Sequence, residues 1–236
     1  MPEPISERGY PHAEMLAETG WLAEHLSDPM GRVVDAGPDK NYDAGHIPGA
    51  VHINGYTLCG LRLGSEMPEP EAFAQLIGSA GIDETTRVVV YDEGATMAGL
   101  VAWAFLYYGH PDTLFLDGGL SKWTAEGRSL SGDGPVHEPR TFSAHLQPAV
   151  YCSLDQAKVG VDSADVMFWD TRSQGEFDGS KAGWNPPPRL GHLPGAIHLE
   201  WPDLFDAQTL TLKPADELSS ILAAVGITPE ASVATY

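Results

Sequence analysis

The feature that most constrains the fold of this chain is an internal repeat that spans most of its length. The segment GHIPGAVHI (Gly45–Ile53) recurs as GHLPGAIHL (Gly191–Leu199), and GIDETTRVVVY (Gly81–Tyr91) recurs as GITPEASVATY (Gly226–Tyr236). The two pairs keep the same order and nearly the same separation. A period this long exceeds the ~20–50 residues of a solenoid unit, so the repeat predicts two copies of one domain.

A third pair of segments sets the domain boundaries. VVDAGPDKNYDAG (Val33–Gly45) and FWDTRSQGEFDG (Phe168–Gly179) align Asp35 with Asp170, and an insertion that includes Lys181–Arg189 follows in the second copy. Between the copies, SLSGDGPVHEPR is rich in Gly, Pro and Ser and has no periodicity, which is typical of a linker. We therefore predict a first domain over residues 1–128, a linker over 129–148 and a second domain over 149–236.

Short apolar runs alternate with helical patterns in both copies. In the first copy we predict strands near Ala13–Leu16 and at Arg32–Asp35, Val51–Ile53, Val88–Tyr91 and Thr113–Leu116. Thr19 is a candidate cap of the helix that follows the first of these strands. In the second copy we predict strands at Ala149–Cys152, Val166–Asp170, Ala196–Leu199 and Ser232–Tyr236. Strands that alternate with helices indicate an α/β fold with a parallel sheet covered on both faces.

Composition narrows the class of protein. The net charge of −20 argues against binding to nucleic acid or to an anionic membrane surface, because both attract Lys and Arg. The chain has no apolar run of membrane-spanning length, and its first residues lack the hydrophobic stretch of a signal peptide. Two cysteines, Cys59 and Cys152, form neither a disulfide framework nor a CxxC pair. We expect a cytoplasmic protein.

The order of these motifs resembles the rhodanese superfamily. The residues that carry the resemblance are Asp-x-Arg at Asp170–Arg172, an acidic–aromatic pair, the two Gly-His-Ile/Leu-Pro-Gly-Ala turns, the apolar strands that end in Tyr, and DGGLSKW (Asp117–Trp123). Two copies in tandem resemble the thiosulfate/3-mercaptopyruvate sulfurtransferases. The resemblance implies two rhodanese-like three-layer α/β/α domains with parallel sheets, the second of them incomplete in this chain.

The resemblance also implies where the nucleophile belongs. In this family the first domain is usually an inactive copy, and the second carries a catalytic Cys directly after the strand. The equivalent residue of the first copy is Asp92, whose carboxylate cannot carry a persulfide, and the first copy has Gly37 where the second has Arg172. The catalytic Cys is expected directly after Tyr236, so no catalytic residue lies in this chain. We therefore expect the chain to be a truncated and inactive fragment.

The expected chemistry is sulfur transfer. A thiolate at the start of a helix, stabilised by loop N–H groups, attacks the outer sulfur of a donor and becomes a persulfide. An acceptor thiol or cyanide then takes the sulfur, and the scheme needs no metal and no organic cofactor. The partners are a small anionic sulfur donor, the acceptor and, as one further partner that we consider, a separate C-terminal fragment of the same protein.

Cationic and turn residues of the second copy complete the predicted site. Arg172 and Arg189 are the candidate substrate-binding residues, because a guanidinium can form paired hydrogen bonds with a sulfonate or carboxylate. We assign structural roles near the site to Asp170, His192 and Tyr236. His192 has a counterpart in the copy expected to be inactive, which favours a structural role over a metal site.

Several alternatives remain open at this point. The chain could be a non-catalytic rhodanese-like binding or scaffold module, or a Cys-dependent phosphatase or arsenate reductase. We predict that Cys152 is a buried, inert thiol on a strand and that Cys59 lies in a loop, and that neither is the nucleophile. Trp184 and Pro186–Pro188 could line the pocket or form a rigid surface loop.

Overall fold

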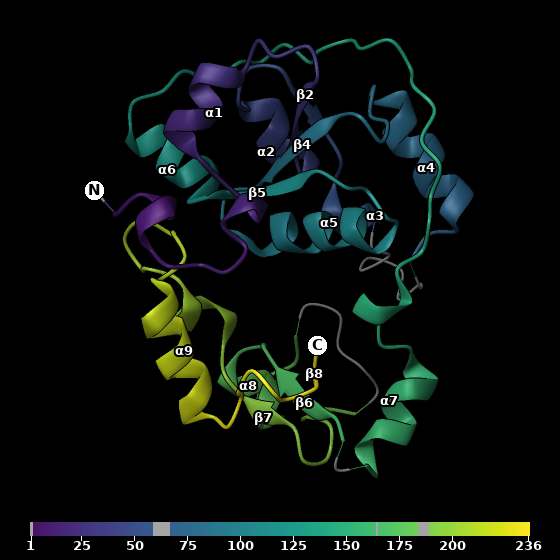
Figure 1. The fold of residues 1–236 in the computed structure, drawn as a ribbon, viewed down its shortest axis with the longest axis vertical. Coiled ribbons are helices and arrows are strands. Elements are labelled where there is room, and N and C mark those ends of the chain that lie inside the picture. The colour runs from purple at the N-terminus through teal and green to yellow at the C-terminus, as the bar shows by residue number, and fades with distance from the viewer. Residues whose placement is uncertain (1, 59–66, 164, 184–188) are drawn as a thin grey trace. The chain divides into compact units, whose positions relative to one another are not determined.

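The computed structural model describes residues 2–58, 67–163, 165–183 and 189–236. The chain divides into two compact units, one of Met1–Val150 with Gln208–Thr211 and one of Tyr151–Ala207 with Leu212–Tyr236 (Figure 1). Three of the residues or segments considered above lie outside the described part of the chain: Cys59, Trp184 and Pro186–Pro188. Among the helices that are described, none is long and apolar enough to cross a membrane.

The first unit is built on a five-stranded parallel sheet in the order β1-β5-β4-β2-β3. Its strands are β1 (Leu16–Glu18), β2 (Gly31–Asp35), β3 (Ala50–His52), β4 (Arg87–Tyr91) and β5 (Thr113–Asp117). The predicted parallel α/β architecture is confirmed. The last strand, β5, lies between β1 and β4.

Helices cover both faces of this sheet. They are α1 (Thr19–His25), α2 (Asp39–Ala44), α3 (Gly55–Leu58), α4 (Pro70–Ser79), α5 (Thr96–Tyr107) and α6 (Gly119–Ala125), with short 3-10 turns at η1 (Ile5–Glu7) and η2 (Ala13–Met15). Because neighbouring residues of a strand face opposite sides, Val33 packs in a core with Leu22 and Trp123, while Val34 packs in another with Phe73. The unit therefore has three layers, with α1 and α6 on one side of the sheet and α5 on the other (Figure 1).

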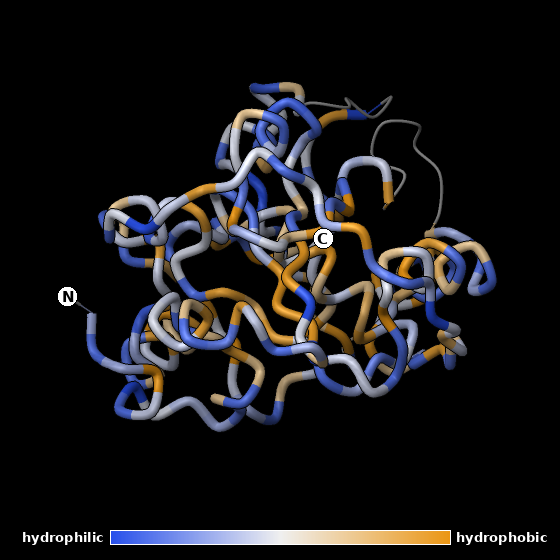
Figure 2. The backbone as a smooth tube through the Cα atoms, turned by 90° about the horizontal axis from the view of Figure 1, so that it is seen from above, coloured by the Kyte–Doolittle hydropathy of each residue, from blue (hydrophilic) through white to orange (hydrophobic). Residues whose placement is uncertain are grey.

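Hydropathy follows this layering. In Figure 2 the hydrophobic stretches of the backbone lie mainly in the interior, and the hydrophilic stretches follow the periphery. The buried residues Val33–Asp35 of β2 and Val88–Tyr91 of β4 account for the apolar runs that predicted these strands, because a parallel sheet covered on both faces buries both sides of its inner strands.

Two predictions at the start of the chain are wrong in detail. The strand expected near Ala13–Leu16 begins only at Leu16, and the three residues before it form η2. Thr19 is not the cap of α1 but its first residue, and the preceding residue makes no side-chain capping bond. The Thr19 hydroxyl instead donates a hydrogen bond to Glu126 at 2.8 Å, which links α1 to the end of α6.

The second unit has a three-stranded parallel sheet in the order β7-β6-β8. Its elements are α7 (Leu154–Val161), β6 (Met167–Asp170), α8 (Gln174–Phe177), β7 (Ile197–His198), η4 (Trp201–Leu204), α9 (Ala215–Ala224) and β8 (Val233–Thr235), preceded by η3 (Pro148–Val150) of the first unit. Strand order β7-β6-β8 repeats the order β3-β2-β4 of the first sheet. The internal repeat is thus also a structural repeat.

The strand predicted at Ala149–Cys152 does not form. Residues 148–150 form η3, and Cys152 is exposed rather than buried on a strand. In the first unit, β1 is an edge strand whose neighbour is β5, which follows β4 along the chain. In the described part of the second unit, residues 149–152 pair with none of the strands β6, β7 and β8, and the chain continues into α7.

The segment predicted as a linker packs against the first unit. The backbone of Ser131 exchanges hydrogen bonds with that of His46 at 3.0 and 2.8 Å. Farther along, the N–H of Arg140 donates to the carbonyl of Gly78 at 2.9 Å, and Phe142 is buried in the core beside α4 and α5. The segment therefore contributes to the packing of the first unit.

The contact at Gly78 gives a testable prediction. A Cβ atom at Gly78 would lie 2.5 Å from the backbone oxygen of Arg140, so Gly78→Ala should displace the segment and expose Phe142, lowering the free energy of unfolding by about 1–3 kcal/mol. Limited proteolysis should then cut residues 129–148 faster. The matched control is Gly99→Ala in α5, where a Cβ meets nothing within 4 Å and should stabilise the unit by about 0.5–1 kcal/mol. Equal effects of the two substitutions would contradict this account.

Candidate functional site

The site is built around an aspartate that ends β6 in the second unit and has a counterpart at the end of β2 in the first. Asp170 ends β6 with its side chain fully buried, and Asp35 ends β2 with 3% exposure. The Oδ1 atom of Asp170 accepts the backbone N–H of Arg172 at 3.0 Å, as Asp35 accepts that of Gly37 at 2.8 Å. In both units the aspartate orders the turn that leaves the strand.

Tyr236 fastens three segments of the second unit together. Its hydroxyl accepts the backbone N–H of Leu193 at 2.9 Å and also bonds Asp170, while its backbone oxygen accepts the N–H of Thr171 at 3.1 Å. Burial raises the pKa of the Tyr236 hydroxyl, so the phenol is neutral at physiological pH. The end of β8, the end of β6 and the turn before β7 therefore meet at this ring.

The first unit repeats this arrangement around Tyr91. The hydroxyl of Tyr91 accepts the backbone N–H of Ile47 at 2.9 Å and bonds Asp35. The backbone oxygen of Tyr91 accepts the N–H of Ala36 at 2.8 Å. The matching sequence segments thus encode the same arrangement in both units, in which a tyrosine hydroxyl bonds the strand-end aspartate and the turn of the Gly-His-Ile/Leu-Pro motif. We call this arrangement the frame.

His192 belongs to the same frame. Its Nδ1 atom lies 2.7 Å from the carbonyl oxygen of Phe177, and its ring stacks on that of Phe177 at 3.8 Å. In the first unit, His46 makes the same two contacts with Tyr42, at 2.9 and 3.9 Å. Within the described part of the chain, no group of three or more His, Cys, Asp and Glu side chains is arranged to hold a metal ion.

Arg172 is the feature that separates the two frames. Its Nε and Nη2 atoms donate to the two oxygens of Asp170 at 3.0 and 2.5 Å, and Nη2 also donates to the carbonyl of Gly191 at 2.9 Å. The guanidinium lies 5.3 Å from the centre of the Tyr236 ring. Gly37 stands at this position in the first unit. The Nη1 group of Arg172 has no partner among the described residues and remains available to a ligand.

Electrostatics hold this pair ionised. Burial alone would raise the pKa of Asp170, but the hydrogen bonds from the side chain and backbone of Arg172 outweigh burial, and the pKa is lowered. The hydrogen bonds that Arg172 donates to Asp170 in turn raise the pKa of Arg172, against the opposing effect of burial. The second unit therefore keeps a cation at the carboxyl ends of β6 and β8, the edge at which ligands bind in open α/β sheets.

Arg189 and Cys152 make few contacts with the rest of the described structure. Arg189 is exposed and has no hydrogen-bond or ion-pair partner in the described ranges, so its role as a substrate ligand stays a prediction. Cys152 is exposed, and its Sγ atom approaches only the carbonyl oxygen of the neighbouring Ser153, at 3.8 Å. No N–H group is directed at this thiol within the described chain.

Backbone N–H groups of the loop after β4 form hydrogen bonds with the carboxylate of Asp92. Asp92 as a whole is 7% exposed, and its carboxylate accepts the N–H groups of Ala95 at 2.5 Å and Met97 at 2.8 Å, at the start of α5. Burial raises the pKa of Asp92, and the N–H groups of Met97 and Ala95 oppose that rise. Ala95 has a left-handed backbone with φ of 76°. The loop and the start of α5 thus direct N–H donors at the position after Tyr91, and these donors offset part of the cost of burying a negative charge there.

Two contacts of the site were missed by the sequence analysis. The hydrogen bond from Arg172 to the carbonyl of Gly191 leaves no signal in the sequence. Every residue has a carbonyl, and only the fold brings this one close to Arg172. The aromatic platform under His192 did leave a signal, since Tyr42 and Phe177 hold equivalent places before the two turns. An aromatic residue paired with a histidine in both repeats could have predicted the stack.

The Asp170–Arg172 pair predicts a pH dependence. A lowered pKa means that the carboxylate contributes stability above its unfolded pKa of ~3.9, and that this contribution is lost as the pH falls through the folded value. Asp170→Asn should remove that dependence and lower the free energy of unfolding at neutral pH by about 3 kcal/mol, because it leaves Arg172 without its charged partner. Urea unfolding between about pH 3 and 7 measures both. The exposed Asp203→Asn is the control, and an equal response of both variants would refute the role of the pair.

Comparison with known proteins gives the family. Residues 18–126 match the Rhodanese-like domain. The chain is 32% identical over 239 residues to the sulfur carrier protein TtuD of Thermus thermophilus, an alignment that covers 97% of this chain and 84% of that protein. It is also 32% identical to the mitochondrial thiosulfate/3-mercaptopyruvate sulfurtransferase 1 of Arabidopsis thaliana, covering 87% of this chain and 63% of that enzyme. The chain therefore spans less than two thirds of the length of the Arabidopsis relative.

A solved structure agrees with the sequence matches. The crystal structure of SseA from Escherichia coli, described as a 3-mercaptopyruvate sulfotransferase with a rhodanese fold, superposes with a TM-score of 0.83 at 25% identity, covering 94% of this chain and 87% of that one. The repeated frame, the parallel sheets and the extent of the match to the Thermus protein lead to one conclusion. This chain belongs to the rhodanese family.

Proposed function

We propose that this chain belongs to a sulfurtransferase that moves a sulfane sulfur from thiosulfate or 3-mercaptopyruvate to a thiol or cyanide through a cysteine persulfide. The nucleophilic cysteine takes the position directly after Tyr236, which corresponds to Asp92 in the first unit. One observation carries the proposal: the second unit places a guanidinium, that of Arg172, beside the tyrosine that follows β8, where the first unit has Gly37 at the equivalent position. The relatives, which are named as sulfurtransferases and a sulfur carrier, support the same class of reaction.

The proposed reaction balances without an external oxidant. With thiosulfate, the thiolate attacks the outer sulfur, the S–S bond of the donor breaks, and sulfite leaves with the electron pair of that bond. Cyanide or an acceptor thiolate then attacks the terminal sulfur of the persulfide, and the cysteine thiolate leaves. Loop N–H groups like those around Asp92 stabilise the thiolate in both steps.

Arg172 orients the donor in this scheme. Because Asp170 occupies the Nε–Nη2 edge of the guanidinium and Gly191 takes the second Nη2 proton, only Nη1 is left for the donor. A single charge-assisted contact suits one oxygen of a sulfonate or carboxylate. On a chain with a net charge of −20, a fixed cation at the site is needed to attract an anionic donor. Arg189 is a second candidate for this role.

The first unit takes a supporting role in this proposal. Its loop already holds the carboxylate of Asp92, and Gly37 supplies no guanidinium, so residues 1–128 act as an inactive domain and residues 149–236 as the beginning of the catalytic one. We further propose a cytoplasmic location and, as the partner that completes the second domain, either a continuous chain or a separate C-terminal fragment. A non-catalytic binding module is the alternative, and it differs by having no cysteine after Tyr236.

The role of Arg172 predicts a split between kinetic constants. In the protein that includes the cysteine, Arg172→Ala should raise the KM for thiosulfate or mercaptopyruvate about tenfold or more, because one hydrogen bond to a charged group is lost. The rate at which a preformed persulfide discharges to cyanide should stay unchanged. Lys158→Ala, which removes an exposed cation of the same unit that pairs with Asp155, serves as the matched control, with thermal melting to verify that both variants fold. Unchanged donor kinetics in Arg172→Ala would remove the residue from the donor site.

The proposed function as a whole is tested by comparing two chains. The 236-residue chain should form no thiocyanate from thiosulfate and cyanide, whereas the chain extended through its reading frame beyond Tyr236 should form it and gain the mass of one sulfur on its cysteine. A mercaptopyruvate assay run in parallel measures the donor preference. Activity in the shorter chain that disappears in Cys152→Ser, or a residue other than cysteine after Tyr236, would contradict the proposal.

A further inference from the structure

A pocket of about 330 Å³ lies in the first unit, away from the strand ends that carry the frame. It opens at the amino ends of the sheet, where β2 begins at Gly31 and β4 begins at Arg87. One wall is formed by α1 and the turn after it, and the floor by Val33 and Val89. All of its lining residues lie in the first unit, and its volume is at the small end of the ~300–1,000 Å³ typical of ligand sites.

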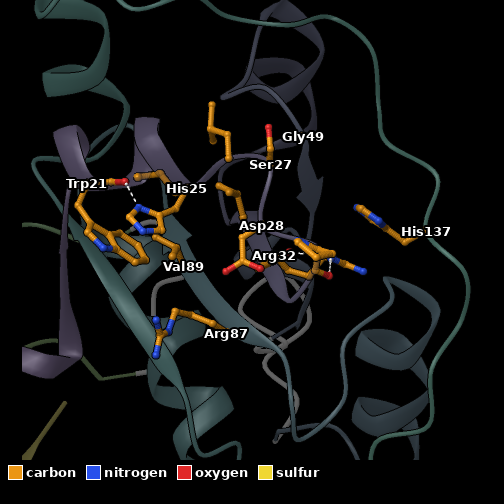
Figure 3. A pocket seen from close by; sticks show the side chains of 14 residues that line it. Trp21, His25, Ser27, Asp28, Arg32, Gly49, Arg87, Val89 and His137 are labelled. Atoms are coloured by element: carbon orange, nitrogen blue, oxygen red, sulfur yellow. Dashed lines mark hydrogen bonds between the residues drawn. The ribbon is translucent and has the colours of Figure 1, made fainter.

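The walls combine an aromatic surface with basic groups. Trp21 and His25 stack at 4.3 Å on one side of the pocket, and His137 lies on the other, with Arg32 and Asp28 between them (Figure 3). Leu22 and Leu26 add further apolar surface; both line the pocket. The pocket thus offers a flat apolar wall on one side and cationic or titratable groups toward the other.

Two enclosed nitrogen atoms at the His137 end are unsatisfied. Arg32 uses Nη1 for the carbonyls of Pro29 and Gly31, at 3.2 and 2.6 Å, but its Nε atom has no hydrogen-bond partner among the described residues. The Nε2 atom of His137 likewise has none within the described part of the chain. A buried donor without an acceptor is destabilising, so an acceptor brought in by a ligand would be favoured here.

The charges around this end also favour an anion. Burial lowers the pKa of His137, and repulsion from Arg32 and Arg140 lowers it further. Burial and repulsion from Arg140 lower the pKa of Arg32, with a partial opposing effect of Asp83. Two other charged residues that line the pocket have partners nearby, since Asp28 accepts the N–H of Met30 and Arg87 pairs with Asp112 at 2.9 Å.

The fold itself does not require these side chains. In the second unit, which repeats the same strands, Met167 holds the place of Arg32 and Ser232 that of Arg87, as the pairing registers show. Gly160 of α7 corresponds to His25 of α1 in the aligned repeat. The sheet and helix form without the basic residues, so their presence in the first unit needs another explanation.

We propose that this pocket binds a small organic carboxylate, with the charged end between Arg32 and His137 and an apolar body along Trp21, Leu22 and Val89. The site is distinct from the proposed sulfur-transfer site, because it lies at the opposite ends of the strands and in the unit that holds Asp92. Its test is therefore independent of sulfur transfer.

Binding can be followed on the 236-residue chain labelled with ¹⁵N-tryptophan. We expect 4-fluorobenzoate to shift the indole resonance of Trp21, assigned with Trp21→Phe, in a saturable way while the resonance of Trp123 stays in place. The neutral 4-fluorobenzyl alcohol should bind about tenfold more weakly, because it loses the charge-assisted hydrogen bonds. Inorganic sulfate should fail to compete, since it has no apolar body.

Two variants locate the charged end. Arg32→Gln and His137→Gln should each raise the dissociation constant for 4-fluorobenzoate about tenfold. Arg128 is a surface arginine of the same unit that does not line the pocket, so Arg128→Gln should leave the dissociation constant unchanged. Unchanged thermal melting verifies that each variant folds. The proposal is overturned if 4-fluorobenzoate does not shift Trp21, if the alcohol or sulfate binds equally well, or if Arg128→Gln weakens binding as much as Arg32→Gln.

Discussion

The structure of the second unit depends on one fully buried carboxylate, that of Asp170. A buried charge is costly unless every lone pair finds a donor, and here the donors come from the turn after β6, from the Arg172 side chain and from the hydroxyl of Tyr236. These contacts hold the strand end, the guanidinium and the end of β8 in one fixed arrangement. The carboxylate of Asp170 therefore both keeps the Arg172 guanidinium charged and fixes its position.

The two units show how one framework can serve two purposes. Around Asp35 and Tyr91 the frame closes on itself, because the next residue, Asp92, supplies a negative charge to the loop donors. Around Asp170 and Tyr236 the same hydrogen bonds carry an arginine that keeps one nitrogen free of partners in the described structure. The difference between a self-contained unit and one that presents a cation rests on few side chains, while the sheet order is shared.

Local patterns predicted most of the fold and the equivalence of residues between the two units. The repeated turns and strands aligned Asp170 with Asp35 and Tyr236 with Tyr91, and the structure places each pair in equivalent contacts. The prediction failed where pairing is non-local: a strand at Ala149–Cys152 has the right local pattern, but strand formation needs a neighbouring strand from a distant part of the chain. The Gly191 carbonyl was invisible for the same reason, because its role depends on proximity rather than on residue type.

The left-handed backbone of Ala95 has a consequence for how the first unit can change over evolution. A non-glycine residue in this region is strained by about 1 kcal/mol or more, and the N–H bond from Ala95 to Asp92 helps to hold it there. Replacing the carboxylate of Asp92 alone would remove the hydrogen bond that helps to hold Ala95 in its strained conformation. Returning the backbone of Ala95 alone to an unstrained conformation would deprive the carboxylate of one N–H donor. The two positions are therefore epistatic, and a change of Asp92 that keeps this loop conformation would require a coordinated substitution at Ala95.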